Sequence, residues 1–125
     1  MGFLGFGENN ISLLKKLIRK FGDLITAIKG CSAPESIKNG LIRKHTENMR
    51  AMVGFEAEFM RGEVSLKRKQ EIREELNYRE NEIIPKRRDI TNQWFFDLSE
   101  RERMEITAIL SDIDQLSIKL NDKLK

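Results

Sequence analysis

The sequence contains one histidine and one cysteine, side-chain types that can serve as a base and a nucleophile near neutral pH. His45 falls at helical spacing between the apolar residues Leu41 and Met49, whereas Cys31 lies in a link between two predicted helices. The helical rise places the two side chains roughly 15 Å or more apart. We therefore predict that they form no thiol–imidazole pair. His45 is expected to be a partly buried packing residue bonded to a neighbour, and Cys31 a structural residue.

Acidic side chains are dense between residues 71 and 82, where paired carboxylates would bind a metal or exchange protons if they faced a pocket. Arginine and lysine alternate with them, which predicts a solvated helix face. No second histidine or glutamate stands at metal-ligand spacing from His45, and no phosphate-binding loop or nucleophile elbow is present. We expect no catalytic, cofactor or metal site, and hence no enzyme. The carboxylates considered are Glu71, Glu74, Glu75, Glu80 and Glu82.

Basic residues form two short runs, one of which is followed by aromatic residues 94–96. Cations beside aromatic rings can bind phosphates and stack on bases. Nucleic-acid binding is therefore our alternative hypothesis. Its residues would be Lys67, Arg68, Lys69, Lys86, Arg87 and Arg88.

Partner binding is the main hypothesis, and its candidate residues lie in the apolar lead-in and around the aromatic trio 94–96. Residues 1–8 contain three glycines and predict a flexible apolar lead-in that could order on a partner. We expect Trp94 and at least one neighbouring phenylalanine to close the core, and an exposed member of that trio to mark a binding site. The predicted partner-binding residues are Phe3, Leu4, Phe6, Lys86, Arg87, Arg88, Trp94 and Phe95.

The apolar spacing that must position these residues is helical throughout. Gaps of three and four residues recur in 14–28 and 106–120, and a longer, less regular stripe runs through 37–59. Asn9 or Asn10, Ser32 with Glu35, Ser65, and Ser99 with Glu102 are predicted helix starts. We predict helices over about 10–30, 33–61, from 65 to a kink or break at Pro85, and over 99–123, and residues 86–97 either continue the third helix or form a short one of their own. They form an all-α antiparallel bundle of four long helices, or five if Pro85 breaks rather than kinks the chain.

Length and composition agree with one bundle domain over residues 9–125. The chain has 125 residues, 39% hydrophobic and 34% charged, and no apolar run approaches the roughly 20 residues of a membrane span. A single cysteine allows no disulfide framework, so a reducing, cytoplasmic location is expected. The net charge is +3, with the basic excess in residues 1–50 and an acidic excess in 97–125. This asymmetry suits either an acidic partner or pairing within the fold.

The function that these observations favour is a small non-catalytic intracellular module that binds another protein, as an adaptor, inhibitor or immunity-type partner. Its support is the lack of catalytic groups, the mixed-charge surface and the apolar lead-in. The heptad-like stripes also suit pairing between two copies of the chain, so a homo-oligomer is compatible with either hypothesis.

Overall fold

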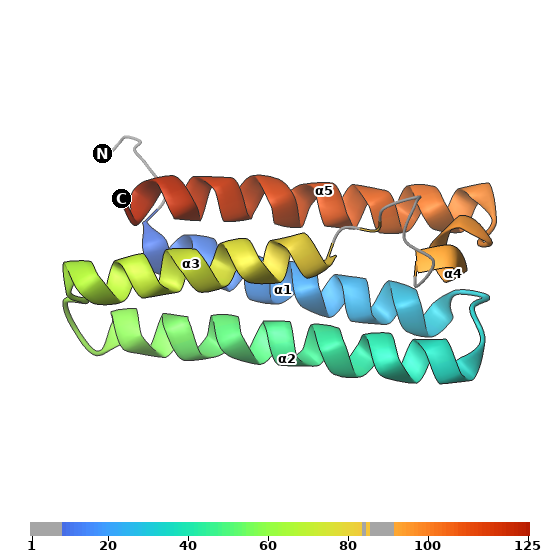
Figure 1. Ribbon diagram of the computed structural model, residues 1–125, viewed down its shortest axis with the longest axis horizontal. Coiled ribbons are helices and arrows are strands. Elements are labelled where there is room, and N and C mark those ends of the chain that lie inside the picture. The colour runs from blue at the N-terminus through green and yellow to red at the C-terminus, as the bar shows by residue number, and fades with distance from the viewer. Residues whose placement is uncertain (1–8, 84, 86–91) are drawn as a thin grey trace.

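The computed structural model describes residues 9–83, 85 and 92–125, which form helices and no strand. The long helices are α1 (Asn10–Gly30), α2 (Glu35–Met60), α3 (Leu66–Ile83) and α5 (Glu100–Lys123), and α4 (Gln93–Phe96) is a single turn. Consecutive long helices run in opposite directions, which confirms the antiparallel bundle (Figure 1). Pro85 lies outside any helix, so the described part holds a short fifth helix rather than one kinked helix. The predicted lead-in, residues 1–8, lies outside the described residues.

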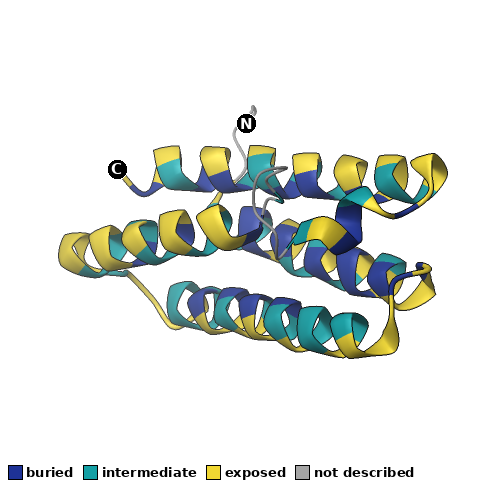
Figure 2. Cartoon of the chain, turned by 45° about the vertical axis from the view of Figure 1, so that its right-hand side comes forward, coloured by how far each residue is buried: buried dark blue, intermediate teal, exposed yellow. Residues whose placement is uncertain are grey.

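Helix α1 is the central element of the bundle because it packs against both α2 and α5. Its apolar stripe is wide enough for two neighbours. The residues of α1 that form this stripe are buried (Figure 2). Exposure is 0% for Leu14, Leu17 and Ile28, and 2% for Phe21. The 3–4–3–4 spacing therefore predicted the core face of this helix correctly.

Side-chain caps define three of the helix starts as predicted. The Asn9 carboxamide oxygen accepts from the Ser12 backbone N–H at 2.8 Å, and the Ser65 hydroxyl accepts from that of Arg68 at 3.1 Å. At α5, Ser99 and Glu102 form a complete capping box. Each bond satisfies a backbone donor that has no partner inside the helix.

The predicted cap at the start of α2 is wrong. Pro34 occupies the N-cap position and offers no side-chain acceptor, so α2 begins at Glu35 without a side-chain cap. Ser32 stands two residues further out, and its hydroxyl donates to the Glu102 carboxylate at 2.7 Å. The serine thus ties the α1–α2 link to the first turn of α5.

Replacing Ser99 with alanine is expected to lower the free energy of unfolding by about 1 kcal/mol, because the capping box loses its acceptor. Ser111→Ala is the matched control, since Ser111 is exposed in the middle of α5. Alanine favours a helix interior, so the control should be neutral or slightly stabilising. Urea unfolding of both variants measures the difference, and equal midpoints would contradict a stabilising role for the cap.

Helix α5 is rotated slightly from the predicted orientation. The predicted stripe ran through Ile109 and Leu116, which are only half-buried, whereas Leu110 and Ser117 are buried in their place. The reason is that α5 contacts α3 as well as α1, so its inner face is shared between two neighbours. A Lys20–Asp112 ion pair of 2.8 Å joins α1 to α5, and part of the charge asymmetry is therefore paired internally.

Helix α3 is held largely by polar contacts. It buries only three apolar side chains, Ile72, Leu76 and Ile83. Toward α2, the Arg68 guanidinium donates to both Glu58 carboxylate oxygens at 2.8 Å. This two-point geometry is the strongest arrangement for an arginine–carboxylate pair.

Candidate protein-binding groove

His45 is 4% exposed in α2, and its imidazole stacks on the Phe21 ring at 6.4 Å between centroids. Its Nδ1 lies 3.4 Å from the Asn48 amide nitrogen, which confirms the predicted packing role. Burial, with a smaller contribution from Lys44, lowers the pKa of His45 to about 4. The ring is therefore neutral at pH 7 and belongs to the core.

The His45 contact continues outward as a polar chain to α3. The Asn48 carboxamide oxygen accepts from Arg79 Nη1 at 2.9 Å, and Arg79 Nε donates to Glu75 at 2.9 Å. Each side chain in this series bonds the next, which lowers the cost of burying histidine and asparagine. This arrangement positions α3 on α2 and presents no reactive group to a cleft.

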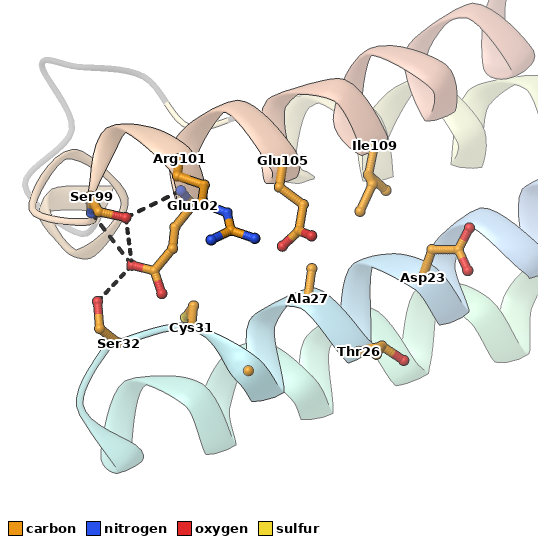
Figure 3. A pocket seen from close by; sticks show the side chains of 11 residues that line it. Asp23, Thr26, Ala27, Cys31, Ser32, Ser99, Arg101, Glu102, Glu105 and Ile109 are labelled. Atoms are coloured by element: carbon orange, nitrogen blue, oxygen red, sulfur yellow. Dashed lines mark hydrogen bonds between the residues drawn. The ribbon is translucent and has the colours of Figure 1, made fainter.

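Cys31 lines a polar cleft of about 900 Å³ between the end of α1, the following link and the start of α5 (Figure 3). Arg101 and Glu105 extend from α5 toward Ala27 of α1 in this view. Cys31 itself is 5% exposed, as its predicted structural role requires. The described lining includes no histidine that could act as a base for the thiol.

Glu102 is the most constrained carboxylate of this cleft. The hydroxyl of Ser32 lowers its pKa, with smaller contributions from the Ser99 backbone and hydroxyl. An acid whose pKa is lowered stays ionised near neutral pH and cannot donate a proton to a substrate. Within this cleft, Glu102 caps α5 and ties it to the α1–α2 link.

No group of three or more histidine, cysteine or acidic side chains is placed to hold a metal ion within residues 9–83 and 92–125. None of the helices that the structure describes has both the length and the apolar character needed to cross a bilayer.

A second groove, of about 530 Å³, lies between α4 and the first half of α5. Its lining is mainly apolar, with one acidic and one basic side chain. The lining residues are Phe95, Phe96, Glu100, Arg103, Met104, Thr107 and Ala108. We call this feature the α4–α5 groove.

Phe95 and Phe96 of α4 form one wall of the α4–α5 groove. Trp94 and Phe95 are buried at 8% exposure each, and Phe96 is half-buried. The Phe95 ring meets Trp94 edge-to-face at 5.7 Å and Phe96 at 5.1 Å between centroids. Such edge-to-face pairs favour one geometry, so the short helix presents Phe96 in a defined orientation.

An uncharged line of side chains begins in the groove and continues along α5. We call it the outer strip, and it consists of Met104, Ala108, Ser111, Gln115 and Ile118, all of them exposed. All five of these residues stand two positions before a buried residue of α5, which is about 200° around a helix. The outer strip therefore lies on the side of α5 opposite its core face, and at its far end Ile118 also lines a small groove beside α3. Met104 is 66% exposed and Ile118 is 52% exposed.

The structure places the predicted partner-binding residues unevenly. Phe3, Leu4, Phe6, Lys86, Arg87 and Arg88 lie outside the described residues. Trp94 closes the core, as expected for one member of the trio, while Phe95 and Phe96 line the α4–α5 groove. The role of these residues in binding stays a prediction.

The basic run 67–69 is only partly available for phosphates. Lys67 is exposed and Lys69 is half-buried. Arg68 is occupied by Glu58 and by Glu71 at 3.2 Å, and its guanidinium lies 5.8 Å from the Phe55 ring centroid. The run therefore acts in part as a link between α2 and α3.

Sequence reasoning missed Met104 and Ala108 as site residues, although the outer strip follows gaps of four and three that mirror those of the core face. The exposed methionine and isoleucine were the signal.

Comparison with known proteins finds no matching family model, no similar curated protein and no similar solved structure.

Proposed function

We propose that this chain is a non-catalytic, intracellular interaction module that binds an amphipathic helix of another protein in the α4–α5 groove and along the outer strip. The observation that carries the proposal is an exposed, mainly apolar groove on a chain with 34% charged residues. Exposed apolar surface lowers the solubility of a small protein and marks interaction sites.

The spacing of the outer strip supports a helical partner. Positions 104, 108, 111, 115 and 118 alternate gaps of four and three, which matches the contact line of a second helix at a shallow crossing angle. The small side chains of Ala108 and Ser111 allow a close approach, and Phe96 with Met104 forms an apolar anchor at one end. A helix-in-groove complex uses this combination of anchor and strip.

The charges beside the groove indicate what the partner carries. Glu100 and Arg103 both line the groove. A partner helix with apolar residues on one face, and a basic and an acidic residue beside it, would complement them. Such complementary charges contribute more to orientation and specificity than to affinity.

The test is photo-crosslinking in cells of the native host, with a photoreactive amino acid at position 108 and a control probe at position 74. Glu74 is exposed on α3, away from the groove. We expect an adduct with one other protein from position 108 alone. The Met104→Glu change should reduce its yield by about tenfold, because a charge opposes burial of the anchor.

Met60→Glu is the matched control for that variant, since Met60 is 62% exposed at the far end of α2. This control should leave the adduct unchanged, and unfolding curves should show both variants folded. An adduct of twice the chain mass would identify a second copy instead, a nuclease-sensitive adduct would favour nucleic acid, and no adduct would refute binding at this face.

A further inference from the structure

The seam between α3 and α5 contains a series of polar side chains beside its apolar contacts. Near the C-terminus of α5, Asn121 accepts from Arg73 Nε at 3.0 Å and donates to the Asn77 carboxamide oxygen at 2.8 Å. Ser117 is buried one turn earlier. A polar group that is buried in such a seam without a partner costs free energy.

Glu80 lies in the same seam, and this corrects the prediction that it belongs to a solvated face. The Asp114 side chain on α5 lies within hydrogen-bonding reach of its carboxyl group. The Glu80 Oε1 atom is buried and has no hydrogen-bond partner among the described residues. Two carboxyl groups can share a hydrogen bond only when one carries a proton, because two carboxylates repel each other and neither has a donor.

We propose that Glu80 and Asp114 form a proton-bearing carboxyl clasp that fastens α3 to α5, and that loss of the proton loosens α3 from the bundle. The clasp matters because α3 has few apolar contacts to hold it in place. Loosening would expose Ile72 and Leu76 together with the core residues that they cover. This inference does not depend on the proposed binding function.

The charged groups near the clasp come from both helices. The groove beside it is lined by Arg73 on α3 and by Asp122 and Lys125 at the end of α5. Arg73 donates to Asn121 and Gln70, and Lys125 pairs with Asp122 at 3.4 Å. Burial is the main influence on Glu80, followed by the hydrogen bond to Asp114 and the charge of Asp114, and together these raise the pKa of Glu80 to about 7.

The pH dependence has a defined sign. Between pH 4.5, the usual pKa of glutamate, and about 7, folded Glu80 keeps a proton that the unfolded chain releases. Its contribution to stability is complete below pH 4.5 and is lost as the pH rises through 7. The loosening of α3 is therefore expected near neutral pH, on the alkaline side.

The first experiment is NMR titration of the full chain with ¹³C-labelled glutamate and aspartate carboxyl groups. We expect one carboxyl signal to titrate near pH 7, and the Asp114→Asn variant to shift that titration downward, because the neighbouring negative charge is removed. Titration of every carboxyl group below pH 5 in the folded protein would overturn the clasp.

The second experiment is amide hydrogen exchange of α3 between pH 6 and 8, corrected for the intrinsic exchange rate. Protection in the wild type should fall by about tenfold across this range. In Glu80→Gln the amide donates to Asp114 without a titratable proton, so protection should become independent of pH. Glu74→Gln is the matched control, because Glu74 is exposed on the same helix, and it should behave as the wild type.

These readouts separate the clasp from general weakening of the bundle. A loss of protection with pH in Glu80→Gln equal to that of the wild type would refute the role of the pair. If Glu80→Gln does not fold, the carboxyl titration of the wild type still decides the question.

Discussion

Replacing Leu17 with alanine is expected to lower the free energy of unfolding by about 3–5 kcal/mol, the range for leucine removal from a close-packed core. Leu17 is 0% exposed on α1, the helix that contacts both α2 and α5. Neighbours on two sides cannot both move into the space, so a cavity should persist. Because a domain of this size is stable by about 5–15 kcal/mol, one truncation should remove a large fraction of the total.

Leu66→Ala is the matched control for this prediction, since it makes the same chemical change at a side chain that is 75% exposed. Its effect should stay within about 0.5 kcal/mol. Urea unfolding, followed by helical circular dichroism, measures both variants. Similar losses in the two variants would mean that α1 is not the centre of the core.

Acidification from pH 7 to 4 is expected to cost about 2–3 kcal/mol of stability through His45 alone. The folded protein keeps the ring neutral down to about pH 4, whereas the unfolded chain takes up a proton below 6.5. The unfolded state therefore binds more protons in this window. The contribution of His45 is complete above pH 6.5 and is lost as the pH falls toward 4.

The measurement is direct because the chain has one histidine. A single imidazole signal in the NMR spectrum should titrate near pH 4, and a value near 6.5 would contradict burial of the ring. The His45→Gln variant should lose the slope of stability between pH 4 and 6.5. It removes the titrating group while keeping a side chain that can bond Asn48.

His45 and Glu80 act in opposite directions over overlapping ranges of pH. Between about pH 4.5 and 6.5, protonation of His45 favours the unfolded chain, whereas protonation of Glu80 favours the folded one. The wild-type profile should therefore be flatter than that of either variant. Glu80→Gln should become less stable on acidification through this range, and His45→Gln should become more stable.

The sequence alone determined the four long helices, three of their side-chain caps and much of the core. Gaps of three and four residues bring apolar side chains to one side of a helix whatever it packs against, so the stripe of α1 was predicted residue by residue. Capping is equally local, because a cap and its backbone donor lie within one turn. The Ser99–Glu102 box was predicted for that reason.

Only the tertiary structure decided which contacts join residues far apart in the chain. Periodicity gives the angle of a side chain about its own helix axis, but not which neighbour stands at that angle. Glu80 was therefore predicted to face solvent, although it lies beside Asp114. Ser32 was predicted to cap α2, although it bonds Glu102. The α4–α5 groove has the same origin, because it requires the short helix and α5 to meet at one defined angle.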